Sequence, residues 1–140
     1  MLVSTKGRYA LRIMLELARH DRDRYIPLPL IAERQGISEK YMESIISVLS
    51  KAGLVEGARG KGGGYRLCRE PKDCSVGEIL RLAEGTLAPV ACLEKPDNLC
   101  PRAEDCQTLP LWETLNRMIN DYLDGVSVED LLHQFSEKAL

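Results

Sequence analysis

The chain has 140 residues, of which 44% are hydrophobic and 29% charged, so it can form one domain with a small helical extension but not two large domains. Aromatic residues make up only 5%, which favours packed helices over a fold dominated by sheets. The net charge of -2 conceals an asymmetry, because residues 1–72 hold 14 Lys/Arg and 8 Asp/Glu whereas residues 73–140 hold 5 and 13. A basic front half suits a protein that presents one face to a polyanion.

The sequence pattern argues against several classes of protein. No run of 18 apolar residues exists and residues 1–20 are amphipathic, so we expect neither a membrane span nor a secretory signal, and therefore a cytoplasmic protein. Paired carboxylates, a Cys-His pair and a phosphate-binding loop are all missing from the pattern, so we do not expect an enzyme. His20 and His133 are isolated in the sequence and are assigned no role.

The basic half begins with a predicted amphipathic helix, capped by Ser4 or Thr5. Its apolar positions recur at helical spacing, and they are Tyr9, Ala10, Ile13, Met14 and Leu17. The opposite face is expected to be polar and solvated, and it carries Arg8, Arg12, Glu16 and Arg19. After a turn at residues 21–24, Tyr25 and Ile26 can form a very short strand.

A helix-turn-helix pattern follows. Pro29 lies in the first turn of a helix that extends to Gln35, Gly36 ends this helix, and Ser38 caps a third helix that extends to about Ala52. The core side of the third helix is predicted to be Met42, Ile45, Ile46 and Leu49. Its opposite side carries Lys40, Glu43, Ser44, Ser47 and Lys51.

This polar side is chemically suited to the major groove of DNA. Small serine side chains allow a close approach to base edges, Glu43 can accept a hydrogen bond from a cytosine amine, and the lysines can contact phosphates. The alternative is a plain solvated helix face.

Residues 54–67 (LVEGARGKGGGYRL) predict two short strands joined by a glycine-rich hairpin. Arg59 and Lys61 place positive charge at a tip with little side-chain bulk, and such a tip can enter a minor groove. An ordinary mobile hairpin is the alternative. A phosphate-cradling loop is disfavoured, because the glycine run has no GKS or GKT ending and no long helix after it. Because it follows a helix-turn-helix pattern, the hairpin is predicted to be a wing.

A short helix capped by Ser75 is predicted to end at Gly85, and residues 86–108 then show no periodicity. This irregular segment contains Cys92, Cys100 and Cys106. Three thiolates on one loop can hold an iron-sulfur cluster; zinc, or free thiols that sense oxidation, are the alternatives. The two remaining cysteines are expected to be small packing residues, and they are Cys68 and Cys74.

A long helix is predicted from Thr108 to Asp124. Its apolar stripe consists of Leu111, Leu115, Met118 and Tyr122, widened by Trp112, Ile119 and Leu123. A stripe of this breadth favours a dimer contact, and packing within one chain is the alternative. A final helix is capped by Ser127 with Asp130 and is expected to pack on the partner or on the winged domain through Leu131, Leu132 and Phe135.

The predicted fold is therefore mainly α with a small β-hairpin wing: a winged helix-turn-helix domain followed by a long C-terminal dimerisation helix. We expect the DNA-binding domain at residues 1–85, a cysteine-containing sensor loop at 86–108, and the dimerisation and C-terminal helices at 109–140.

Four segments carry a resemblance to a known family, namely STKGRYAL at 4–11, ISEKYMESIISVLSKAGLV at 37–55, RGKGGGYRL at 59–67 and LAEGTLAPVACLE at 82–94. They resemble the winged-helix regulators that include the iron-sulfur cluster regulator IscR, the nitric oxide sensor NsrR and the cysteine metabolism repressor CymR. The resemblance implies a homodimer, mostly acting as a repressor, that binds a pseudo-palindromic operator in double-stranded DNA.

The resemblance also implies roles for individual residues. The recognition-helix positions correspond to Ser38, Lys40, Tyr41, Glu43 and Ser44. The wing tip corresponds to Arg59 and Gly60, beside Lys61, and the positions near the DNA backbone correspond to Lys6 and Tyr9.

The cofactor that the resemblance implies is an iron-sulfur cluster, of the 2Fe-2S type, held by Cys92, Cys100 and Cys106. Its fourth ligand stays open, because Leu109 stands where IscR-like members have a His and Arg8 where NsrR-like members have an Asp. The other interpretation is a regulator without a cluster, similar to the cysteine metabolism repressor and controlled by a metabolic enzyme or by thiol oxidation.

Overall fold

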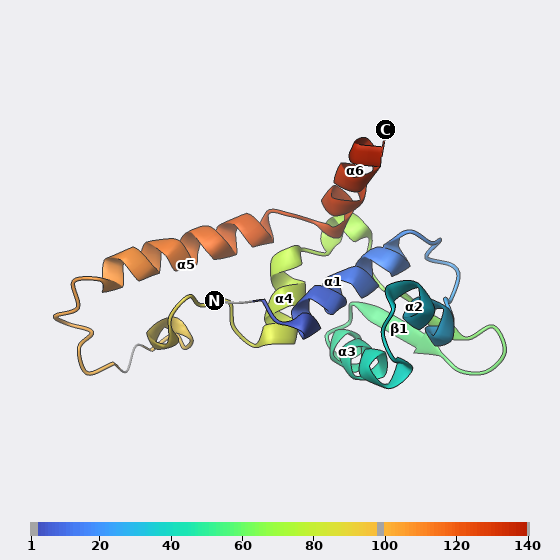
Figure 1. Ribbon diagram of the computed structural model, residues 1–140, viewed down its shortest axis with the longest axis horizontal. Coiled ribbons are helices and arrows are strands. Elements are labelled where there is room, and N and C mark those ends of the chain that lie inside the picture. Colours follow the sequence, from blue (N-terminus) through green and yellow to red (C-terminus); the bar gives the residue numbers. More distant parts are fainter. Residues whose placement is uncertain (1–2, 98–99, 140) are drawn as a thin grey trace.

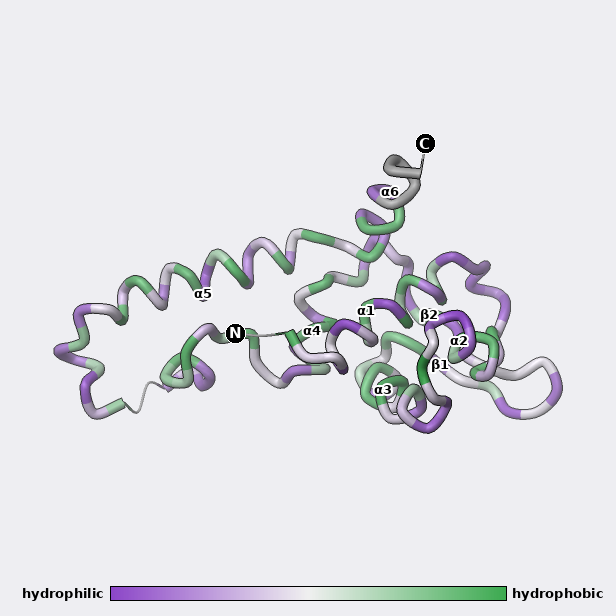
Figure 2. The backbone as a smooth tube through the Cα atoms, in the orientation of Figure 1, coloured by the Kyte–Doolittle hydropathy of each residue, from purple (hydrophilic) through white to green (hydrophobic). Residues whose placement is uncertain are grey.

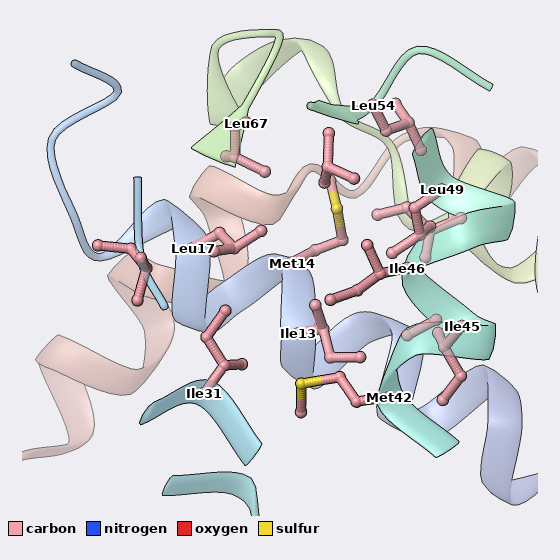
Figure 3. Close-up of a cluster of buried hydrophobic side chains, with 14 of the residues drawn as sticks. Ile13, Met14, Leu17, Ile31, Met42, Ile45, Ile46, Leu49, Leu54 and Leu67 are labelled. Atoms are coloured by element: carbon pink, nitrogen blue, oxygen red, sulfur yellow. The ribbon is translucent and has the colours of Figure 1, made fainter. Parts of the chain in front are cut away.

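The hydrophobic core lies where the first three helices meet (Figure 3). The computed structural model describes residues 3–97 and 100–139. Its elements in chain order are α1 (Thr5–Ala18), α2 (Leu28–Gln35), α3 (Glu39–Lys51), β1 (Val55–Ala58), β2 (Gly64–Leu67), the 3-10 turn η1 (Pro71–Asp73), α4 (Val76–Glu84), the 3-10 turn η2 (Ala91–Leu93), α5 (Leu109–Asp124) and α6 (Val128–Ala139). The predicted, mainly helical fold with a two-stranded hairpin is confirmed (Figure 1).

The core side of α3 follows the predicted helical spacing. Met42, Ile45 and Ile46 are almost fully buried, and they face the buried Ile13 and Met14 of α1. Burial of each such side chain stabilises the fold by roughly 1.5–3 kcal/mol, so this cluster fixes the position of α3 relative to α1. The exposed side of α3 is thereby fixed as well.

The turn between α2 and α3 forms as local chemistry predicts. Gly36 adopts a left-handed conformation with φ of 65°, which ends α2 at low cost because glycine has no Cβ. Ile37 is buried beneath the turn, and the Ser38 hydroxyl accepts a hydrogen bond from the Tyr41 backbone N–H at 3.2 Å. The two helices therefore form a helix-turn-helix.

The wing is an antiparallel hairpin in which Val55 pairs with Leu67 and Ala58 pairs with Gly64. The very short strand expected at Tyr25 and Ile26 is a single bridge, with Ile26 and Tyr65 exchanging backbone hydrogen bonds of 2.8 and 2.9 Å. A Cβ on Gly64 would collide with the Ile26 carbonyl, so glycine is required where this bridge crosses the wing. The bridge fixes the wing to the segment that precedes α2.

One prediction for α1 is wrong: Glu16 is buried, with 3% of its surface exposed. Helical spacing placed it on the solvated face, but Arg34 reaches across from α2 and donates to its carboxylate at 2.8 Å. Arg19 donates at 3.1 Å from the same helix as Glu16. The ion pairs allow this carboxylate to be buried where the side-chain pattern alone predicted exposure.

The remaining helices extend from this body. The C-terminal part of α5 packs on α4, where Ile119 and Leu123 contact a small buried cluster of Val76, Leu80 and Leu87. Of the two alternatives for the apolar stripe of α5, a dimer contact or packing within one chain, these two residues follow the second. The first half of α5 extends away from the winged domain (Figure 1).

Helix α6 begins with the predicted capping pair. Ser127 and Asp130 exchange hydrogen bonds of 2.9 and 3.0 Å between backbone N–H groups and side chains. Val128 is fully buried in the main core, so of the two expected positions for α6 the start of the helix takes the one on the winged domain. In the described part of the chain, every helix is too short or too polar to cross a membrane.

Candidate nucleic-acid interface and cysteine loop

The polar side of α3 is exposed along its whole length. Lys40, Tyr41, Glu43 and Ser44 all lie on this side, opposite the buried Met42 and Ile45. A surface hollow of about 390 Å³ is lined by Ser38, Lys40, Tyr41 and Ser44. An exposed helix face with small polar, acidic and aromatic groups can contact base edges in a major groove.

The start of α1 lies beside this face. The rings of Tyr9 and Tyr41 meet edge to face with centroids 6.0 Å apart, and the Arg12 guanidinium lies 5.1 Å from the Tyr9 ring centre. Arg12 also donates to the Gln35 carbonyl and side-chain oxygens, both at 2.8 Å. Tyr9 is half-buried by these contacts, and Lys6 is one helical turn before it. The structure therefore joins α1, α2 and α3 into one surface.

The wing tip is exposed and positively charged. Arg59, Gly60 and Lys61 are all exposed, and among the described residues neither cation makes an ion pair. Arg66, further down the wing, is different: its guanidinium donates a hydrogen bond to Glu56 at 2.6 Å and lies over the Tyr25 ring, and this hydrogen bond to the Glu56 carboxylate raises the pKa of Arg66. The tip cations are thus the ones available to an external phosphate.

A hollow of about 560 Å³ separates the wing from the start of α2, and its lining includes Pro27, Ser50, Arg59 and Tyr65. Because Ser50 belongs to α3, the hollow borders both elements that a winged domain applies to adjacent grooves of DNA. The hollow has a glycine-rich wall, which leaves little side-chain bulk next to the tip.

The three loop cysteines do not converge in the described conformation. Cys92 and Cys100 line one hollow of about 420 Å³, together with Glu94, Lys95 and Asp97. Cys106 lines a different hollow. Within residues 3–97 and 100–139, no three Cys, His, Asp or Glu side chains lie close enough together to hold a metal ion. The thiols suit an iron-sulfur cluster in chemistry, but their arrangement here does not form a complete site.

The cysteines differ in their surroundings. All five are free thiols. A hydrogen bond with the Thr108 hydroxyl, at 3.3 Å, lowers the pKa of Cys106, which favours the thiolate. Burial raises the pKa values of Cys68 and Cys74, and Cys74 is fully buried in the core. The prediction that Cys74 is a packing residue is therefore confirmed.

The apolar stripe of α5 is largely uncovered. The exposed fractions of Leu111, Leu115, Met118 and Tyr122 are 59%, 37%, 64% and 71%. Figure 2 shows hydrophobic segments recurring along this helix where it extends away from the winged domain. Large apolar side chains repeated along one exposed helix face are typical of a protein-protein contact.

Comparison with known proteins agrees with this arrangement. The model of the family described as "Rrf2: Iron-dependent Transcriptional regulator" matches residues 3–134. The chain belongs to the Rrf2 family. A curated Rrf2-type relative, the HTH-type transcriptional regulator IscR of Aliivibrio salmonicida, is 40% identical over 132 residues, which are 94% of this chain and 77% of that protein. Such relatives are transcription regulators and not enzymes, which confirms that expectation.

Solved structures show the same fold. The structure of T. potens IscR has a TM-score of 0.80 and 41% identity, covering 100% of this chain and 92% of that one. CymR of B. subtilis, called the global cysteine regulator, has a TM-score of 0.75 and 37% identity, covering 94% and 95%. The Rrf2 chain described here is therefore a DNA-binding transcription regulator of this type, as its sequence motifs predicted.

Three residues that connect helices of the fold were not recognised from the sequence. Glu84 lies against the start of α1, Arg81 connects α4 to α5, and Glu16 connects α1 to α2. Each contacts a residue on another element that is distant in the sequence. The sequence holds no local signal for such contacts.

Proposed function

We propose that this protein is a homodimeric, sequence-specific DNA-binding repressor that responds to an iron-sulfur cluster or redox signal at its cysteine loop. The observation that carries the DNA-binding part is the pairing of an exposed polar face on α3 with a wing tip whose two cations make no ion pair among the described residues. The α3 face suits a major groove, and the wing tip suits an adjacent minor groove.

Recognition of sequence would come mainly from α3. Glu43 can accept a hydrogen bond from a cytosine amine, and on the same exposed side of the helix-turn-helix a hollow is lined by Ser38, Lys40, Tyr41 and Ser44. Arg59, Gly60 and Lys61 would enter a minor groove, while Lys6 and Tyr9 would lie near the backbone. All ten residues belong to α1, α3, the α3 cap or the wing tip.

The dimer contact would be the exposed stripe of α5. Leu111, Leu115, Met118 and Tyr122 stay exposed, while Ile119 and Leu123, at the edge of the same apolar stripe, pack on the α4 cluster. A second copy crossing this stripe would bury the apolar surface and place two recognition helices on one side of the dimer. Such an assembly matches a pseudo-palindromic operator.

The signal would act on the loop that contains Cys92, Cys100 and Cys106. These three thiols are the residues that would hold a cluster, as the relation to IscR supports. When bound, the cluster supplies redox and oxygen sensitivity. Because Cys106 lines a separate hollow, holding it with the other two requires the segment near Cys106 to move.

A second candidate keeps the DNA-binding function but not the cluster. The likeness to CymR, a global cysteine regulator, and the separation of the three thiols favour control by thiol oxidation or by a metabolic enzyme that binds the dimer. Iron and sulfide content distinguishes the two candidates.

The test of the DNA-binding proposal uses a duplex enriched from random DNA by the wild-type protein. Arg59→Ala should weaken binding to this duplex and lower the salt dependence by about one phosphate contact, whereas Glu43→Ala should relax base preference at one position. Lys72→Ala is the matched control, because Lys72 is an exposed cation on η1, away from α3 and the wing. If Arg59→Ala binds as tightly as the control, the wing does not contact DNA.

A further inference from the structure

The start of α1 has an unusual charge pattern for a helix N-terminus. Its first turn contains no acidic residue but does contain Lys6, and Arg8 follows immediately. Positive charges are disfavoured there, because the first backbone N–H groups of a helix already carry partial positive charge. The proposed phosphate contacts require cations at this position. An anion from elsewhere in the chain would therefore stabilise the N-terminus of α1.

Glu84, the last residue of α4, supplies that anion. Its carboxylate accepts a hydrogen bond of 2.9 Å from the Ser4 backbone N–H and one of 2.6 Å from the Ser4 hydroxyl. The Ser4 hydroxyl in turn accepts from the Gly7 N–H at 3.3 Å, as a normal helix cap. The cap of α1 is therefore itself held by a residue 80 positions away in the chain.

Gly7 provides a second, independent observation. It is buried in the first turns of α1, and a Cβ at this position would collide with the Glu84 carboxylate. Glycine is unfavourable inside a helix, and a side chain at this position would require the end of the flexible Glu84 side chain to shift. Both the polar contacts and the missing side chain thus describe one closely fitted junction between α4 and α1.

This junction connects the cysteine loop to the DNA-facing surface. Gly85 follows Glu84 with φ of 85°, and the loop then passes the buried Leu87 towards Cys92. On the other side, Lys6 and Tyr9 follow the capped residues of α1, and the Tyr9 ring contacts Tyr41 of the recognition helix. Figure 1 shows α4 beside α1.

We infer that Glu84 is a positioning residue for DNA binding: it fixes the N-terminus of α1 and so places Lys6 and Tyr9 against the DNA backbone. This inference rests on the DNA-binding function proposed above. Because Glu84 is also the last residue before the loop, a change in the loop that withdraws its carboxylate reduces operator affinity without any change in α3 or the wing.

The experiment measures binding to the duplex enriched by the wild-type protein, over a range of salt concentrations. Glu84→Ala is expected to weaken binding by about fivefold, the scale of losing a helix cap, and to lower the salt slope by about one phosphate contact. Glu84→Gln keeps an acceptor oxygen but loses the charge, so its affinity should lie between those of Glu84→Ala and the wild type.

Two further variants separate positioning from stability. Gly7→Ala raises helix propensity but displaces the carboxylate, so it should weaken DNA binding without lowering the melting temperature. Ser127→Ala is the matched control, because it removes a capping pair of the same kind from α6. It should lower stability as Glu84→Ala does and leave operator affinity unchanged.

A double-mutant cycle gives the decisive result. If Glu84 acts through the placement of Lys6 and Tyr9, the double variant Glu84→Ala with Lys6→Ala should lose less affinity than the sum of the two single losses, because part of the Glu84 effect passes through Lys6. Additive effects, or equal losses of affinity in Glu84→Ala and Ser127→Ala, would overturn the inference. Failure of the wild-type protein to enrich any duplex would instead overturn the DNA-binding proposal, so the two failures are distinguishable.

Discussion

The replacement Glu16→Gln should destabilise the protein at neutral pH and much less in acid. Glu16 is 3% exposed, and its carboxylate accepts hydrogen bonds from Arg34 at 2.8 Å and Arg19 at 3.1 Å. Burial by itself raises the pKa of Glu16, but the hydrogen bonds from Arg34 and Arg19 outweigh it, so the pKa lies below its ordinary value of 4.5. The folded protein therefore favours the ionised carboxylate.

The size of the effect follows from these contacts. A hydrogen bond to a charged group contributes about 1.5–3 kcal/mol, and Gln keeps an acceptor while both guanidinium groups stay partly exposed, so the expected loss is about 2 kcal/mol in total. With a denaturant slope of about 2 kcal/mol per molar urea, the unfolding midpoint at pH 7 should fall by about 1 M.

The pH dependence has a definite sign. Because the folded-state pKa of Glu16 is depressed, its contribution is fully present above the unfolded value of about 4.5 and is lost as pH falls through the folded-state pKa. Urea unfolding of the wild type and Glu16→Gln at pH 7 and at a pH well below 4.5, at one protein concentration, measures this. Glu33→Gln, which changes an exposed carboxylate on α2, is the control. An equal difference at both pH values would show that the ionised Glu16 carboxylate is not the stabilising group.

Two other predictions concern assembly and the cysteine loop. Met118→Glu places a charge on the exposed stripe of α5 and should convert a dimer to a monomer in sedimentation experiments. Arg117→Glu, which introduces the same carboxylate side chain at a polar position of the same helix, should leave the dimer intact. A dimeric Met118→Glu would contradict the assigned contact. Protein purified without oxygen should contain iron and acid-labile sulfide. Cys92→Ser should remove both, whereas Cys68→Ser should not. Colourless wild-type protein would favour the cluster-free candidate.

Local chemistry explains what could be predicted from the sequence. The caps at Ser38 and Ser75, the left-handed Gly36 and the core positions of α3 each depend on residues within a few positions, so spacing alone locates them. The wing also follows from a short segment, because its glycines and alternating strands form one hairpin.

The missed features depend on contacts between distant segments. Glu16 followed the pattern of a solvated helix face, and only the approach of Arg34 from α2 explains why it is buried. Ile119 and Leu123 belong to the same apolar pattern as Met118, and the packing of α4 decides which of them stay exposed. The arrangement of the cysteines could not be predicted either, because an aperiodic loop carries no signal for its own path.

In the proposed assembly, two copies joined through α5 present two winged domains to one DNA site. The most direct test is the sequence that the wild-type protein enriches from a random DNA library. We expect the enriched sequence to be an inverted repeat, with half-sites one helical turn or a multiple of it apart. Footprinting should show protection over both halves. A single asymmetric half-site bound by a monomer, or no enriched sequence at all, would contradict this assembly.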